Sequence, residues 1–399
     1  MVQLADRVHR VKPSFTLEMT SRAAELRAQG VDVINFSAGE PDFNTPEYIR
    51  NAAKKALDEG YTKYTAGAGM IELRQAVCAK LKRENDLDVK PEQVLISNGE
   101  KQSLSLACQT LFQAGDKGLV FRPFWVSYPE FVKLADSKPI LLNTIAERNY
   151  EPDFVALEDI IADDIKGVIV NSPSNPTGGV WSEAALLKLL RLAQLNDWVV
   201  ISDECYERLV FEGQFVSMEK LNREHGIGAE VLTCMSLSKT YAMTGWRIGY
   251  AFGGIRLIQG MAKLQGQTTS CANAIGQKAA VAALMGDQTP VEKMRAAFKE
   301  RRNLMVKLLN KIPEVNCALP GGAFYAFPDM SYYLGKEVHG KQLKNSFDLS
   351  DYLLSEGRIV TVPGDGFGAP GYIRFSYATD METIEKGIRR TRVVLEKLT

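Results

Sequence analysis

Short apolar segments alternate with amphipathic segments through the middle of the chain, and this alternation limits the possible fold more than any other feature. Segments that are apolar throughout need cover on both faces, as in parallel sheets. The predicted strands cover residues 93–97, 117–121, 139–142, 167–171, 198–203 and 231–236. The predicted helices among them cover residues 98–112, 124–135 and 182–196. We therefore expect an α/β fold with a mostly parallel central sheet and helices on both faces.

The two ends of the chain differ from this middle part. Before it, the spacing of apolar residues predicts a strand at 31–36 and helices at 14–29, 46–59 and 70–85. After it, the pattern predicts a strand at 372–377 and helices at 291–311, 348–357 and 381–397. We expect an N-terminal segment that packs on the small domain, a large domain, and a small C-terminal α/β domain, with the ranges 1–45, 46–290 and 291–399.

Composition excludes several classes of partner. Lys+Arg and Asp+Glu both number 48 in the 399 residues, so bulk charge favours neither nucleic acid nor a membrane surface. No apolar run approaches the roughly 20 residues of a membrane span. The first twelve residues are charged, and we expect no signal peptide. The expected partners are small molecules and a second copy of the chain, since zero net charge leaves self-association unopposed.

Cysteine and histidine usage points to a reduced, metal-free protein. The six cysteines are scattered without a C-x-x-C pair, which predicts buried thiols in the cytoplasm rather than disulfides. The three histidines, His9, His225 and His339, are far apart in the sequence. We therefore expect neither a histidine metal site nor a serine-type triad.

Polar residues follow three successive predicted strands, at residues 171–178, 203–206 and 236–239. Ligands of open α/β sheets bind outside the carboxyl ends of the strands. A fourth strand end, at residues 97–101, opens a helix whose free N–H groups favour an anion. The spacing is not that of a P-loop, and no Gly-x-Gly-x-x-Gly follows a strand. Each piece alone has an ordinary explanation as a turn or a helix cap, and the conjunction indicates a site.

Lys239 lies at the end of the third of these strands. A lysine in a loop is usually solvated. Near Arg247, or once desolvated, its amine is suited to Schiff-base chemistry. Together with an anion cradle and an acid, such a lysine fits pyridoxal 5′-phosphate. Asp203 suits the pyridine nitrogen, Trp125 the ring face, and Asn175 and Tyr206 the ring hydroxyl.

Several motifs together resemble one family. They lie at residues 12–14, 39–43, 64–67, 99–102, 124–129, 171–178, 202–206, 236–247, 321–325 and 374–378. Over essentially its whole length, the chain resembles the fold-type I pyridoxal-phosphate aminotransferases of class I. It is most similar to the bacterial aspartate aminotransferase branch that includes aspartate/prephenate aminotransferases. The resemblance implies a large domain that binds the cofactor and a homodimer with shared active sites.

The resemblance also implies roles for individual residues. Lys239 would carry the cofactor and move the substrate proton. Phosphate would be bound by Gly99, the backbone of Glu100, Ser236, Arg247 and, from the neighbouring subunit, Tyr64. The implied cofactor set is Tyr64, Gly99, Glu100, Lys101, Trp125, Asn175, Asp203, Tyr206, Ser236, Lys239 and Arg247. The implied substrate set is Lys12, Gly39, Lys101, Trp125, Asn175 and Arg374, with Arg374 on the α-carboxylate.

One departure from the animal-type enzymes bears on specificity. No arginine occurs between Arg256 and Arg295, where the arginine for the distal carboxylate is expected. In the bacterial branch a lysine takes over, and Lys101 matches it, while Lys12 matches a lysine associated with prephenate. The implied reaction is transamination between aspartate or glutamate and 2-oxo acids, 2-oxoglutarate and oxaloacetate, with prephenate giving arogenate.

Three alternatives stay open. The same cofactor would serve an aromatic or glutamine-type aminotransferase, or a carbon–sulfur lyase. A regulator that binds the cofactor would need a basic DNA-binding domain ahead of this part, and only a short segment precedes it here.

Overall fold

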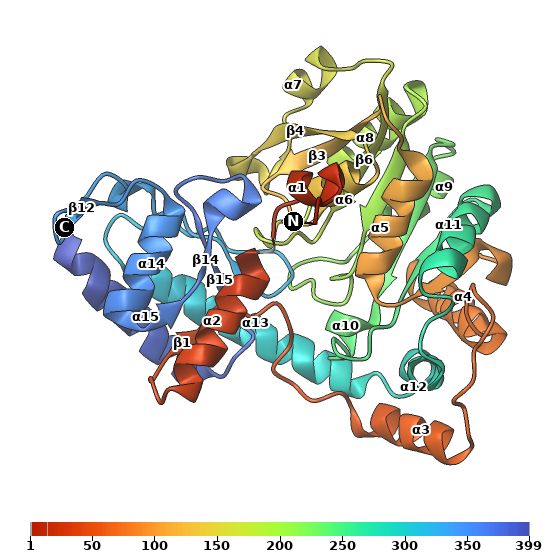
Figure 1. Ribbon diagram of the computed structural model, residues 1–399, viewed down its shortest axis with the longest axis horizontal. Helices are drawn as coiled ribbons and strands as arrows, with labels where there is room; N and C mark the ends of the chain where they lie inside the picture. The colour runs from red at the N-terminus through yellow and green to blue at the C-terminus, as the bar shows by residue number, and fades with distance from the viewer. Residues whose placement is uncertain (1, 14, 399) are drawn as a thin grey trace.

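The computed structural model describes residues 2–13 and 15–398, and a large sheet forms its centre (Figure 1). The eight strands follow the order β2-β9-β8-β7-β6-β3-β4-β5. The strands β3, β4, β6, β7 and β8 run parallel, and β9 is antiparallel to both β2 and β8. The bounds are β2 Val94–Ser97, β3 Lys117–Arg122, β4 Lys138–Ile145, β5 Glu151–Pro152, β6 Ile165–Asn171, β7 Val199–Asp203, β8 Glu230–Ser236 and β9 Gly249–Phe252. The expected mostly parallel sheet is confirmed.

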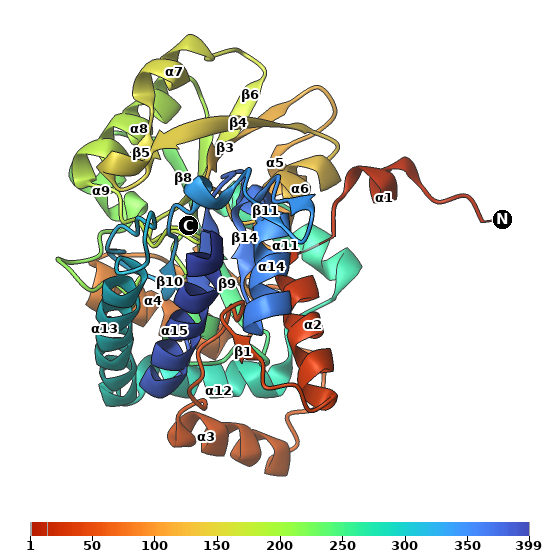
Figure 2. The same ribbon diagram turned by 90° about the vertical axis from the view of Figure 1, so that its left-hand side faces the viewer.

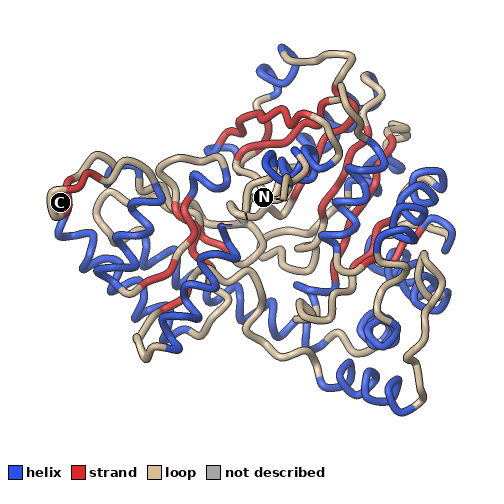
Figure 3. Tube along the Cα trace, in the orientation of Figure 1, coloured by secondary structure: helices blue, strands red, loops and turns tan. Residues whose placement is uncertain are grey.

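Helices cover both faces of this sheet. Successive residues of one strand point to opposite faces, and both are buried. Ile201 belongs to a core that includes Leu104 of α5, whereas Val200 belongs to one that includes Leu189 of α8. Figure 3 shows the strands enclosed between these helices. The helices of this part are α5 Glu100–Leu111, α6 Tyr128–Leu134, α7 Phe154–Asp159, α8 Glu183–Leu195, α9 Met218–Glu224, α10 Leu237–Thr240, α11 Ile255–Thr268 and α12 Ala274–Met285.

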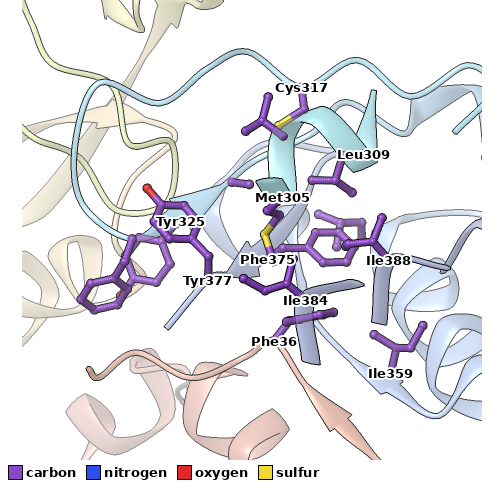
Figure 4. Packing of buried hydrophobic residues seen from close by; sticks show 14 of the residues in the cluster. Phe36, Met305, Leu309, Cys317, Tyr325, Ile359, Phe375, Tyr377, Ile384 and Ile388 are labelled. Atoms are coloured by element: carbon purple, nitrogen blue, oxygen red, sulfur yellow. The ribbon is translucent and has the colours of Figure 1, made fainter. Parts of the chain in front are cut away.

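A second core is formed by the long helix α13 (Thr289–Leu309) and the elements that follow it, and Figure 2 shows α13 beside α15. Its small antiparallel sheet has the order β10-β15-β14. Phe375 and Tyr377 pack there with Met305 of α13 and Ile384 of α15 (Figure 4). The elements of this part are β10 Tyr325–Ala326, β11 Glu337–Val338, β12 Lys341–Gln342, α14 Ser346–Gly357, β13 Ile359–Val360, β14 Val362–Pro363, β15 Ile373–Ser376 and α15 Met381–Leu395.

The N-terminal residues are joined to this second core. The strand β1 (Ile34–Asn35) pairs in parallel with β13, and Phe36 is buried against Phe375. The remaining N-terminal helices are α1 Asp6–Arg10, α2 Phe15–Ala28, α3 Glu47–Asp58 and α4 Ile71–Asn85. The domain boundaries at residues 45 and 290 stay predictions.

Some predicted elements have the wrong extent, and some observed elements were not predicted. The strand predicted at 31–36 is only two residues long, and the helix predicted at 124–135 begins at Tyr128, after Pro123 and a turn. The strand β9 and the helices α11 and α12 were not predicted. Among the described residues, no helix has the length and apolar character needed to cross a membrane.

Candidate active site

A cavity of about 550 Å³ lies at the carboxyl ends of β6, β7 and β8, and it reaches β15. It is lined by predicted site residues that come from widely separated motifs of the sequence. These are Gly39, Glu100, Lys101, Trp125, Asn175, Asp203, Tyr206, Ser236, Lys239, Arg247 and Arg374. The structure therefore brings most of the candidate residues into one place, as the geometry of parallel sheets predicts.

Lys239 enters the cavity from α10, a single turn that directly follows β8. Ser236 begins that turn, and its Oγ accepts a hydrogen bond from the Ser238 amide at 3.0 Å. The Lys239 amine donates to the Gly39 carbonyl oxygen and lies 5.7 Å from the centre of the Phe324 ring. Burial lowers the pKa of this amine. A lowered pKa increases the fraction of neutral amine, which is the nucleophilic form.

Asp203 is the last residue of β7 and is buried. The Tyr128 hydroxyl donates to its Oδ2 at 2.6 Å, and the Cys205 amide donates to its Oδ1 at 3.3 Å. Tyr128 was not among the predicted site residues, although it lies in the quoted motif at 124–129. These two donors fix the orientation of a carboxylate that faces the cavity, which suits it to hold a cationic ring nitrogen.

An anion cradle lies at the N-terminus of α5. Gly99 has a φ of 78°, and a Cβ at this position would collide with the Arg247 guanidinium. Gly99 itself does not line the cavity, but its lack of a side chain lets the cation approach the free amides of the helix. The pKa of the nearby Lys101 amine is lowered by burial and then by the charge of Arg247. Crowded cations at a helix N-terminus fit a phosphate group.

Arg374 of β15 closes the opposite side of the cavity and is 1% exposed. Its guanidinium donates to Asn175 Oδ1 at 2.8 Å and to the Ser37 carbonyl oxygen at 2.9 Å, and it stacks 4.4 Å from the Tyr325 ring centre. Its Nε has no hydrogen-bond partner among the described residues. A buried cation with an unpaired donor is suited to an anionic ligand.

Tyr206 lies between these two sides. Its hydroxyl is 3.1 Å from that of Tyr325, which the sequence quoted in a motif but did not assign to the site. Burial raises the pKa of Tyr206 well above its ordinary value, and Tyr325 adds to this effect. Tyr206 therefore stays a neutral phenol that can donate to a ligand oxygen.

Besides Gly99, two of the predicted residues do not line the cavity. The Tyr64 side chain is 89% exposed. Lys12 is also exposed, and its backbone amide donates to Glu130 at 3.0 Å. Their proposed roles stay predictions.

Glu204, beside Asp203, faces away from the cavity and holds the start of α9. Its Oε1 accepts from the hydroxyls of Ser202 and Ser217 at 2.9 and 3.1 Å and from the Met218 amide at 3.0 Å. Burial raises the pKa of Glu204 to about 7.

We predict that Glu204→Gln changes the pH dependence of stability. Between the ordinary pKa of 4.5 and about 7, the folded protein binds a proton that the unfolded chain releases. Stability from this group is therefore full below pH 4.5 and is lost as the pH rises through 7, by about 3 kcal/mol. Urea unfolding across this range, at fixed cofactor concentration, should show that loss in the parent and not in Glu204→Gln. The exposed Glu385→Gln is the control, and equal slopes in all three proteins would contradict the prediction.

Comparison with known proteins shows the family of this chain. A family model described as aminotransferase class I and II matches residues 31–390. The chain belongs to this family. It is 41% identical to the aspartate aminotransferase of Bacillus sp. (strain YM-2) over 97% of each chain. It is 39% identical to the aspartate/prephenate aminotransferase of Nitrosomonas europaea, over 99% of this chain and 100% of the other.

Solved structures of aspartate aminotransferases have the same fold as this aminotransferase. The one from Thermus thermophilus with maleate has a TM-score of 0.92 and 38% identity, and covers 99% of this chain and 100% of its own. The one from Rhizobium meliloti has a TM-score of 0.94 and 37% identity, and covers 100% of both. The fold-type I architecture is therefore confirmed.

The cofactor of this aminotransferase is pyridoxal 5′-phosphate. The residues present fit it in three respects. The cavity holds a buried amine, Lys239, for the aldehyde. It holds a fixed carboxylate, Asp203, for the pyridine nitrogen. Gly99 leaves space for Arg247 at the helix terminus, where a phosphate group would fit.

Proposed function

We propose that this aminotransferase transfers the amino group between L-aspartate or L-glutamate and 2-oxo acids, namely 2-oxoglutarate and oxaloacetate. The observation that carries the proposal is that Lys239 shares one cavity with Arg374 and Lys101, two cations on different elements, in addition to Arg27 and to Arg247, which is proposed to bind the phosphate. Two cations suit a substrate with two carboxylates. The names of the relatives from Bacillus and Nitrosomonas support the choice of aspartate.

The cofactor, when bound, supplies an electron-accepting ring. The residues of the chain would hold it and handle protons. Lys239 would bind the aldehyde carbon and then carry the proton taken from the substrate Cα. Asp203 would keep the ring nitrogen protonated, and Asn175 and Tyr206 would hold the ring oxygen. Gly99, the backbone of Glu100, Ser236 and Arg247 would bind phosphate.

The substrate would lie between the cations. Arg374 would bind the α-carboxylate through its planar guanidinium, and its contact with Asn175 at 2.8 Å fixes that plane. Gly39 and Trp125 would line the space between. The Lys101 amine, 5.2 Å from the centre of the Trp125 ring, would bind the distal carboxylate.

We propose a homodimer in which Tyr64 reaches the phosphate of the neighbouring subunit, and the strong exposure of this tyrosine supports the proposal. We also propose a cytoplasmic location, which the six free cysteines support.

Prephenate is a second proposed amino acceptor, giving arogenate, with Lys12 in its recognition. Aspartate/prephenate aminotransferase is the name of relatives at 39% identity from Nitrosomonas europaea and 42% from Cereibacter sphaeroides.

The experiment is an acceptor screen on purified protein. We expect a visible absorption band of the bound cofactor, turnover of aspartate with 2-oxoglutarate, and slower turnover with prephenate. A protein with the band but without turnover of aspartate or glutamate would contradict the proposed reaction. In that case, turnover of phenylalanine, glutamine or cystathionine would identify one of the alternatives.

We predict that Lys101→Ala lowers kcat/KM for aspartate by about 10- to 100-fold, as expected for loss of one hydrogen bond to a charged group. For phenylalanine, which has no distal carboxylate, kcat/KM should change less than threefold. Steady-state kinetics with both amino acids measure this difference, and Lys101→Arg should restore part of the aspartate activity. Equal losses for the two substrates would instead show that Lys101 acts on the cofactor alone.

A further inference from the structure

The side chain of Glu100 has an environment that its backbone role does not explain. Glu100 is the first residue of α5, is 7% exposed and lines the cavity. A carboxylate oxygen of Glu100, one of Asp203 and the Cys205 sulfur lie within 4.8 Å of one another. Glu100 Oε1 has no hydrogen-bond partner among the described residues. An unpaired, buried carboxylate oxygen is costly to leave charged.

Two carboxyl groups this close in a buried site do not both ionise. The other titratable groups that face Glu100 come from three further elements and from the residues after β7. Cys205 and Cys234 are buried thiols, the Tyr128 hydroxyl already donates to Asp203, and Lys239 is the one cation among them. Burial raises the pKa of Glu100 well above its ordinary value, and the charge of Asp203 raises it further. The Lys239 charge and a side-chain hydrogen bond with Cys205 oppose this shift but are smaller effects.

The hydrogen-bond donors around the two carboxyl groups also indicate which one carries the proton. Asp203 already accepts two hydrogen bonds, from Tyr128 and from the Cys205 amide, so it is the acceptor of the pair. The unpaired oxygen is on Glu100. The shared proton therefore belongs on Glu100. The protonated Glu100 carboxyl can then donate a hydrogen bond to Asp203 itself.

We propose that Glu100 is a positioning residue whose carboxyl group stays protonated and donates a hydrogen bond to the Asp203 carboxylate. Asp203 is then held by three donors and carries the single negative charge of the pair. This inference rests on the proposed role of Asp203 toward the pyridine nitrogen. It adds that Asp203 acts together with Glu100, as two carboxyl groups that share one proton.

Infrared spectroscopy of the full chain tests where the proton resides, with and without the cofactor. Because Glu204 also titrates near pH 7, the measurement is made in a Glu204→Gln background. There we expect a carbonyl band of a protonated carboxylic acid at pH 7 that shifts with ¹³C-glutamate labelling and is lost in Glu100→Gln. In Asp203→Asn the neighbouring charge is removed, so the band should titrate at a lower pH than in the parent. Absence of the band, or a band lost in Asp203→Asn and kept in Glu100→Gln, would overturn the proposal. The measurement without cofactor does not depend on the proposed function, which the acceptor screen tests separately.

Kinetics provide a second readout through a conservative variant. Gln at position 100 keeps an N–H that can donate to Asp203, whereas Ala leaves Asp203 without this donor. We expect Glu100→Ala to lose about 10-fold more in kcat than Glu100→Gln, with similar KM values. If the role of Glu100 were purely structural, the kcat of each variant would fall in parallel with its thermal stability. Equal kcat losses in the two variants would contradict the proposal.

Discussion

Lys239→Ala should lower kcat for aspartate by about 10⁴-fold, the upper range for removing a positioned proton-transfer group. The amine is buried, its pKa is lowered by burial, and it is the lysine at the carboxyl end of β8. Under the proposed function, its removal would take away both the amine for the cofactor aldehyde and the group that moves the substrate proton. Steady-state kinetics measure the loss, and the visible spectrum should lose the band of the lysine-bound cofactor.

The matched control is Lys263→Ala, an exposed lysine of α11. It should keep the parent's kcat and spectrum. Turnover of Lys239→Ala within about tenfold of the parent would contradict the assignment of Lys239 as the catalytic lysine.

Arg374→Lys should lower kcat/KM for aspartate by about 10²- to 10³-fold, the cost of disrupting a buried, hydrogen-bonded charge pair. The guanidinium is held flat by Asn175, the Ser37 carbonyl and the Tyr325 ring. A lysine keeps the charge but cannot present two parallel donors to a carboxylate. The α-carboxylate is common to all amino-acid substrates, so the loss should be similar for aspartate and phenylalanine.

Arg302→Lys is the control for placing a lysine at a buried arginine. Arg302 is also 1% exposed, but it binds the Pro320 carbonyl oxygen and Glu212, away from the cavity. It should lower the melting temperature and leave KM unchanged. A loss in Arg374→Lys confined to aspartate would place Arg374 at the distal carboxylate instead.

Sequence patterns predicted the parallel part of the sheet well, because β6, β7 and β8 each contain a run of buried, mostly apolar residues. The strand β9 escaped prediction since it is four residues long and continues a loop in which Arg247 has a φ of 54°. Its antiparallel direction depends on pairing with β2, which lies far away in the sequence. Such a pairing leaves no local pattern.

The site was predictable where sheet geometry alone determines position. Asn175, Asp203 and Lys239 follow the ends of neighbouring strands, so their convergence follows from the order of the strands. The Glu100 side chain and Tyr128 were missed because their directions depend on the packing of α5 and α6 against Asp203. The separation of Lys12 and Tyr64 from the cavity likewise depends on tertiary structure.

The pairing of β1 with β13 has a consequence for synthesis on the ribosome. The strands β2 to β9 are contiguous in the chain, so their sheet can form while later residues are still being translated. By contrast, Ile34 and Phe36 leave the ribosome early, yet their partners Ile359 and Phe375 are made almost last. This apolar segment therefore waits for its partners until nearly the whole chain is translated, longer than the strands of the large sheet wait for theirs.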